Sequence, residues 1–172
     1  MFKGGSGISA GVAYNVPLVA NLFLEPGASI FYDTYRTDDF STNICDMLFD
    51  NAHIKISQFG IRIPIMLGYH FDVNERARIN VMTGPQFGLG LVGKYKAKGY
   101  QINDFDSSDD NLYSDDGGFN RFNLQWAVGA GTTIDKFDFS IKYFFGLTNM
   151  LKDGGDVKYK ENLLQVSVGY NF

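Results

Sequence analysis

The stretch that decides the fold reads FGIRIPIMLGYHF, from Phe59 to Phe71. Apolar residues occupy every second position along it, and the positions between them are more mixed. Successive side chains of a β-strand point to opposite faces, so a period of two predicts a strand with one continuous apolar face. The rest of the chain repeats this pattern.

The same alternation marks seven segments in the 172 residues, with no helical periodicity of useful length between them. The sequence therefore predicts an all-β fold, in which neighbouring strands run antiparallel in up-and-down order. The predicted strands are Gly7–Leu18, Asn21–Tyr35, Phe59–Phe71, Arg78–Tyr95, Arg121–Ile134, Phe137–Thr148 and Leu163–Phe172.

The connections between the predicted strands alternate between short turns and long polar stretches. In an antiparallel sheet, this order places all short turns at one end and all long connections at the other. Transmembrane β-barrels have this asymmetry, with short periplasmic turns and longer extracellular loops. The short turns are Pro17–Asn21, Asp72–Arg76 and Asp135–Lys136, and the long connections cover residues 36–58, 97–120 and 149–161.

The less apolar face of the strands favours a membrane barrel over a soluble, calycin-like one. A soluble barrel would present a face dense in Lys and Glu to water. Here that face carries mainly Gly, Ser, Asn, Gln and Thr, which suits the crowded interior of a narrow barrel. Aromatic residues also gather near both ends of the apolar face, as in the interfacial girdles of outer-membrane proteins. The predicted girdles are Tyr14, Tyr69, Phe71, Phe137, Tyr170 and Phe172 at the short-turn end, and Tyr32, Phe59, Tyr95 and Phe122 at the other.

Composition excludes several classes of protein. The net charge of −4 and the pI near 5.0 argue against a nucleic-acid partner. The single cysteine, Cys45, rules out an internal disulfide framework and a zinc cluster of paired thiols. No stretch approaches the roughly 18 apolar residues of a membrane-spanning helix.

Three motifs and the last strand resemble a known family. The motifs are Ile61–Ile65 (IRIPI), Gly84–Gly88 (GPQFG) and Tyr143–Asn149 (YFFGLTN). In this order and spacing, over residues 7–172, the chain resembles the small outer-membrane β-barrel proteins labelled PorT-like or "outer membrane protein beta-barrel domain". The resemblance implies an eight-stranded barrel in the outer membrane of a Gram-negative cell.

The C-terminal strand looks like the signal that the outer-membrane assembly machinery reads. It ends on Phe172, with another aromatic, Tyr170, two positions earlier. Gln165 takes the polar position of the signal, and Ser167 stands where glycine is commoner. The same strand is expected to pair with the first strand when the barrel closes.

Seven strands are one too few for this family, because single-chain bacterial barrels have an even number. We read residues 1–172 as a single barrel domain, without a recognisable signal peptide. We expect that the signal peptide and a first strand are missing before Gly7, which predicts an open seam between the first and the last strand.

Two prolines fall inside predicted strands, although proline cannot donate to a β-ladder. Pro64 lies in the third strand and Pro85 in the fourth. A closed barrel has no edge strand to hold them, so each is expected at a bulge or at an unpaired end.

Charged residues on the less apolar face are the candidate site. Glu25, Arg78 and Asp138 each lie near a short turn, and a charge buried in the lumen must be paired. We therefore expect an ion-pair cluster of these three, with His70 nearby. The cluster could be a selectivity filter or substrate cradle, or a packed polar plug, since eight-stranded interiors are usually filled. Lys142 is expected deeper in the lumen, and Arg62 and Arg121 nearer the outer mouth.

The sequence offers no catalytic or metal-binding set. His53 and His70 have no metal-ligand spacing, and no nucleophile–base pair can be assembled. The acidic stretch 104–118 could bind calcium, but its spacing does not match an EF-hand, and an acidic surface loop is more often solvated. We therefore expect no cofactor and no enzymatic activity.

The expected function is that of a membrane-embedded structural or accessory protein, acting through its extracellular loops. Its expected partners are outer-membrane lipid, the assembly machinery and other envelope proteins. A narrow pore or small-ligand binder is the alternative, followed by a lipid-active enzyme and a soluble calycin-like binder.

Overall fold

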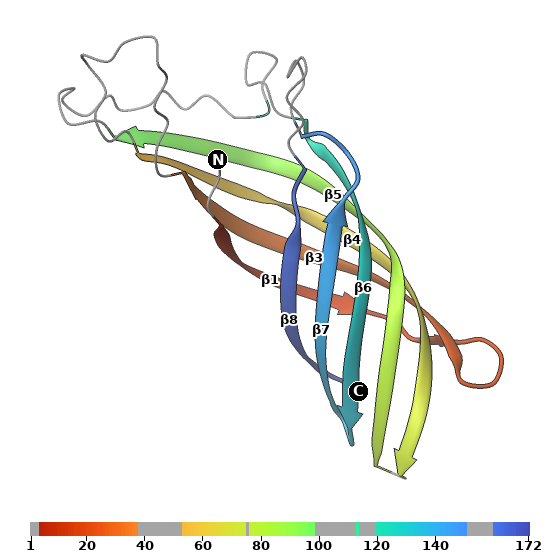
Figure 1. The fold of residues 1–172 in the computed structure, drawn as a ribbon. Coiled ribbons are helices and arrows are strands. Elements are labelled where there is room, and N and C mark those ends of the chain that lie inside the picture. Colours follow the sequence, from red (N-terminus) through yellow and green to blue (C-terminus); the bar gives the residue numbers. More distant parts are fainter. Residues whose placement is uncertain (1–3, 38–52, 75, 99–112, 114–119, 151–159) are drawn as a thin grey trace.

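The structure is a computed structural model that describes residues 4–37, 53–74, 76–98, 113, 120–150 and 160–172 (Figure 1). Every regular element in this part of the chain is a β-strand. The strands are β1 (Gly5–Ala13), β2 (Val16–Pro17), β3 (Leu22–Thr37), β4 (His53–Asn74), β5 (Ala77–Lys98), β6 (Phe122–Ile134), β7 (Phe137–Gly146) and β8 (Leu163–Tyr170).

The strands form one antiparallel sheet in the order β1-β3-β4-β5-β6-β7-β8, and the short β2 pairs with β3. The sheet is strongly curled, with the shape of a half-barrel (Figure 1). All seven predicted segments are strands, the first of them divided into β1 and β2. The prediction of an antiparallel up-and-down sheet is therefore confirmed.

The sheet is open between its first and last strands. Strands β1 and β8 occupy the two ends of the strand order and are not neighbours in the described part of the chain. The predicted seam between them is therefore confirmed. Since each step across the seven-strand path reverses direction, β1 and β8 run parallel to each other. The expectation that a further strand precedes β1 stays a prediction.

The outward face of the sheet is apolar along its whole width. Ile63 on β4, Val81 on β5 and Ile141 on β7 are all more than 40% exposed. Exposed apolar area of this extent is not stable in water and indicates a nonaqueous surrounding. Among the described residues, no helix has the length and hydropathy needed to cross a membrane.

The inner face is packed with large side chains that lie over glycines. An added Cβ at Gly68 would lie 2.2 Å from the ring of Phe23, which is 1% exposed. In the same way, the ring of Phe31 lies against Gly60. Because these two glycines of β4 have no side chain, aromatic rings from β3 fit against the β4 backbone. The concave side of the sheet is therefore filled. The core itself consists of Met66, Met82, Ala127 and Phe144, with Leu163 packed against it.

A β-bulge at Leu91 breaks the alternation of β5. Phe59 pairs with Val92 and Gly60 pairs with Gly90, so Leu91 is the extra residue. Leu91 and Val92 are both exposed, Gly93 is buried, and Lys94 is again exposed. Unbroken alternation from Leu89 would place Lys94 on the inner face, and the bulge instead makes it exposed. The side chain of Tyr95, predicted in the outer aromatic girdle, is not described.

The two prolines lie where the ladder is interrupted without a shift in register. Between β3 and β4, the paired positions skip from Pro26–Ile65 to Ser29–Arg62, which leaves Pro64 unpaired on that side. Between β4 and β5, the ladder is likewise interrupted at Pro85, which has no paired residue on β4. The expectation of a bulge or an unpaired strand end at these prolines is therefore wrong. Each occupies a gap inside a strand, where no donor is required.

Candidate functional site

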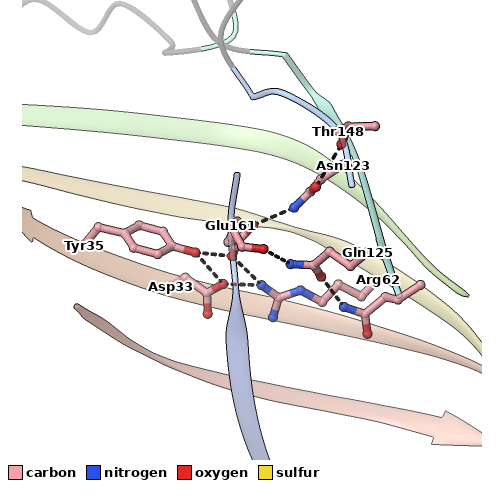
Figure 2. Close-up of polar contacts among 8 residues, drawn as sticks. Asp33, Tyr35, Arg62, Asn123, Gln125, Thr148 and Glu161 are labelled. Atoms are coloured by element: carbon pink, nitrogen blue, oxygen red, sulfur yellow. Dashed lines mark hydrogen bonds and ion pairs between the residues drawn. The ribbon is translucent and has the colours of Figure 1, made fainter. Parts of the chain in front are cut away.

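A buried polar cluster occupies the inner face of the sheet toward the end with the long connections (Figure 2). We call it the lumen cluster and define it as Asp33 and Tyr35 on β3, Arg62 on β4, Asn123 on β6, and Glu161. Glu161 lies outside the strands, two residues before β8. The cluster joins strands that are not neighbours in the sheet, so it spans the concave interior.

Among the described residues of the cluster, the cation is Arg62, and it faces two carboxylates. Its Nη2 forms an ion pair with Asp33 and lies 3.4 Å from Oε1 of Glu161. The three side chains are each only 6% exposed. The guanidinium also lies over the ring of Phe31, at 3.8 Å from the ring centroid. Arg62 thus compensates charges that would be very costly to bury alone.

Glu161 is held by side chains from both sides of the interior. The Tyr35 hydroxyl donates a hydrogen bond to Oε1, and Nδ2 of Asn123 donates to Oε2 at 2.7 Å. Nε2 of Gln125 donates to the Glu161 backbone carbonyl at 3.1 Å. An added Cβ at Gly146 would lie 2.5 Å from that same carbonyl oxygen, so the absence of a side chain there allows Glu161 to approach β7.

The hydrogen bonds continue from the lumen cluster along β5 and β6. Nε2 of Gln86 donates to Oε1 of Gln125 at 2.7 Å, and both amides are about 2% exposed. The Thr148 hydroxyl donates to Oδ1 of Asn123 at 3.1 Å. In the described part of the chain, no buried side-chain nitrogen or oxygen lacks a hydrogen-bond partner. A buried polar network in which every group has a hydrogen-bond partner makes the interior of a barrel rigid.

The surroundings of the lumen cluster raise the pKa values of Glu161 and Tyr113. Burial raises the pKa of the Glu161 carboxyl; the hydrogen bond from Tyr35 and the Arg62 charge oppose this, while Asp33 adds to it. Tyr113 lies outside the strands, with its ring against Gly90. Burial, helped by the charges of Glu161 and Asp33, raises the pKa of Tyr113 to about 12.

The raised pKa of Glu161 predicts a stability that falls as pH rises. The folded carboxyl holds its proton more tightly than the unfolded one, so stability is lost from about pH 4.3 upward, through the folded-state pKa. We expect Glu161→Gln to flatten this part of the profile. Urea unfolding in detergent micelles between about pH 4 and pH 8, followed by Trp126 fluorescence, measures it. An unchanged slope in Glu161→Gln would contradict the assignment.

The predicted ion-pair cluster of Glu25, Arg78 and Asp138 is not what the described contacts show. Arg78 is opposite Asp72 in the strand register, and the two form a pair at 3.2 Å in which both side chains are more than half exposed. Because its carboxylate partner lies on the adjacent strand, Arg78 stays exposed at the short-turn end of the sheet. Glu25 pairs instead with Lys142, at 3.4 Å between Oε1 and Nζ.

Asp138 and His70 are held by neutral partners. Asp138 accepts a hydrogen bond from the Thr133 hydroxyl at 2.9 Å. The His70 ring stacks on Phe23 at 4.0 Å between centroids, and its Nδ1 lies 2.6 Å from Oδ1 of Asn80. Asn80 in turn donates to Asp138 at 3.5 Å. These contacts make a second polar layer toward the short turns.

Of the two arginines expected at the outer mouth, Arg62 belongs to the lumen cluster, whereas Arg121 is exposed and lies 6.0 Å from the Tyr113 ring. Sequence reasoning missed Asp33, Tyr35 and Glu161. The alternation of β3 does place Asp33 on the inner face, a signal that could have identified it. Glu161 lies in no alternating segment, so periodicity gives no indication of its position.

The residues of the predicted assembly signal lie on and just after β8. Gln165 donates a hydrogen bond to Ser167 at 3.1 Å on the inner face. Tyr170 and Phe172 are exposed, and their rings meet edge to face at 5.5 Å. The Tyr170 ring also packs on Phe137 at 5.6 Å, so the short-turn end carries a continuous aromatic group.

In the described residues, no group of three or more His, Cys, Asp or Glu could hold a metal ion. Cys45 and the acidic stretch 104–118, except for Tyr113, lie outside the described residues. The side chain of His53 is likewise not described.

An antiparallel curled sheet with an apolar outside and a packed polar interior defines the class of membrane β-barrels. Residues 3–152 match the family described as "outer membrane protein beta-barrel domain". The chain belongs to this family, and its location is the outer membrane. Searches of curated proteins and of solved structures gave no match. The PorT-like subtype stays a prediction.

Proposed function

We propose that the protein is a non-conducting and non-catalytic scaffold or accessory subunit of the outer membrane, which acts through the connections at its outer end. One observation carries this proposal: the inner face is filled. Phe23, Met66 and Phe144 are at most 1% exposed. Above them, the lumen cluster and the Gln86–Gln125 pair leave no buried polar side-chain atom unsatisfied in the described residues.

A filled interior is typical of small barrels that do not conduct. A pore or a ligand cradle would instead require open space lined by polar groups with capacity for water or solute. The buried polar groups here are already bonded to one another, which favours a structural role for them. The same contacts support a non-catalytic function, since a base or nucleophile must be able to reach its substrate.

Conductance in planar lipid bilayers tests the proposal. We expect the full-length protein to insert without discrete conductance steps. The double variant Phe23→Ala/Phe144→Ala should produce steps, because it removes two rings that fill the interior. Phe139→Ala/Phe145→Ala removes two outward rings and serves as the control, which should remain silent. Regular steps in the wild-type protein would overturn the proposal in favour of a narrow pore.

The assembly machinery of the outer membrane is the partner that we propose for the C-terminal strand. Tyr170 and Phe172 provide two exposed aromatic rings at the end of β8. In the described part of the chain β8 is the last strand of the sheet, so its outer edge also offers backbone groups for strand addition.

A further inference from the structure

Residues 160–162, which we call the strap, leave the wall of the barrel and lie over its interior. The ladder between β7 and β8 begins at Leu163, although β7 continues to Gly146. Instead of a backbone pair, the amide of Gly146 donates to Oδ1 of Asn162 at 3.0 Å. An added Cβ at Gly146 would lie 2.5 Å from the backbone oxygen of Glu161 and 2.8 Å from its nitrogen. The strap therefore lies against the inner face of β7.

The strap is held by polar contacts of Glu161 with three strands that are not neighbours of β8. Its carboxylate meets Tyr35 on β3, Arg62 on β4 and Asn123 on β6 (Figure 2). Its backbone carbonyl accepts a hydrogen bond from Gln125, also on β6, at 3.1 Å. These contacts do not belong to the backbone ladder of β8, so the strap can leave the interior while β8 stays paired with β7.

The hydroxyl of Tyr35 lies between two carboxyl groups but has a single proton. It lies within hydrogen-bonding distance of Oε1 of Glu161, and its oxygen is 3.4 Å from Oδ2 of Asp33. With both acids ionised, the hydroxyl can donate to only one of them. If Glu161 carries a proton, Glu161 can donate to the Tyr35 oxygen and Tyr35 can donate to Asp33. One added proton therefore completes the hydrogen bonds.

The charges of the cluster balance in the same protonation state. Arg62 contributes one positive charge, and Asp33 and Glu161 contribute two negative charges when both are ionised. An uncompensated charge is costly at sites where each side chain is only 6% exposed. One proton on Glu161 removes the excess. Burial raises the pKa of the Glu161 carboxyl, which supports the assignment of the proton to this residue.

The other surroundings of Glu161 add little that changes with pH. β6 brings the neutral amides of Asn123 and Gln125, and β7 brings Gly146, which has no side chain. Burial raises the pKa of Tyr113 to about 12, so this hydroxyl keeps its proton at neutral pH. In the described part of the chain, the titratable and charged groups around Glu161 are Asp33, Tyr35, Arg62, Tyr113 and Arg121.

We propose that one proton on Glu161 holds the strap in the barrel interior, and that loss of this proton to the solvent releases the strap. Docking favours the protonated acid, so the docked strap is fully stabilised below the pKa of free glutamate, about 4.3. This stabilisation is lost as the pH rises through the pKa of the docked carboxyl. Between the two values, each pH unit changes the ratio of released to docked strap by about tenfold. The proposal goes beyond the scaffold role and holds whether or not the lumen conducts.

Distances between two spin labels, measured by double electron–electron resonance on the full chain in detergent micelles, test the proposal. Cys45→Ser removes the single native thiol. Lys160→Cys and Ile79→Cys carry the labels, one on an exposed residue of the strap and one on an exposed residue of β5. We expect one narrow distance at about pH 5 and a second, broad population at about pH 9. A distribution that does not change with pH would overturn the proposal.

Three charge variants identify the proton. Glu161→Gln has a donor and an acceptor, as the protonated acid does, and should keep the narrow distance at both pH values. Asp33→Asn leaves Arg62 and an ionised Glu161 in balance, and should also keep it. Asp72→Asn removes an exposed carboxylate at the short-turn end and is the control, which should respond like the wild-type protein. A wild-type response in either cluster variant, or a lost response in the control, would contradict the assignment.

A second label pair separates release of the strap from unfolding of the sheet. Leu164→Cys takes the place of Lys160→Cys, so that the measured distance joins β8 to Ile79 on β5. This distance should stay narrow over the same pH range. If it broadened together with the strap distance, the response would belong to the whole sheet and the strap would not be an independent switch.

Discussion

The Arg62→Met variant should lose about 3–5 kcal/mol of unfolding free energy, the cost of breaking a buried ion pair by removing one partner. Asp33 and Glu161 would both remain in the interior without a compensating cation, each with a side chain only 6% exposed. Methionine retains much of the volume of arginine, so the loss would report charge rather than a cavity. Urea unfolding in detergent micelles measures it.

Two further variants separate this effect from other causes. Arg78→Met breaks the exposed pair with Asp72, for which at most about 1 kcal/mol is expected. Asp33→Asn/Glu161→Gln, added to Arg62→Met, should restore most of the stability, because no buried charge then remains at these three positions. If Arg62→Met were as stable as Arg78→Met, the lumen cluster would not depend on its arginine.

The Phe144→Ala variant should lose about 3–5 kcal/mol, the usual cost of removing a fully buried phenylalanine. Phe144 is 1% exposed and belongs to the core with Met66, Met82 and Ala127. Its neighbour Phe145 points to the outward face and is 45% exposed. Phe145→Ala is therefore the matched control, and its loss should be at most about 1 kcal/mol, since lipid contact contributes only tenths of a kcal/mol per apolar residue. Equal losses would mean that the interior is not packed.

The strands could be predicted because each has one apolar face, and a period of two is a local property of the sequence. Segments such as Phe59–Phe71 carry this signal in every residue. The bulge at Leu91 carries no comparable signal. Leu91 and Val92 are both apolar, so either could continue the alternation. Which of them is extra depends on how β5 pairs with β4 around Gly60, and one sequence segment does not contain that information.

The candidate site was predicted in part, for the same reason. Arg62 was expected in the lumen because it alternates with apolar residues, but its partners could not be read from the chain. Glu161 is 99 residues away and lies outside any strand. Arg78 shows the opposite error: its position near a turn suggested a buried cluster, yet Asp72 on the adjacent strand is closer. Partner choice depends on curvature and register, which are properties of the whole sheet.

The strand order has a consequence for how the sheet forms. Every pairing joins strands that follow one another along the chain, apart from the small β2. The entropy lost on closing a connection grows with the logarithm of its length, by about 0.6 kcal/mol for each doubling. The two-residue turns of β4–β5 and β6–β7 therefore lose the least entropy on closure. The two hairpins can form independently and then associate, so their formation does not depend on contact between β1 and β8.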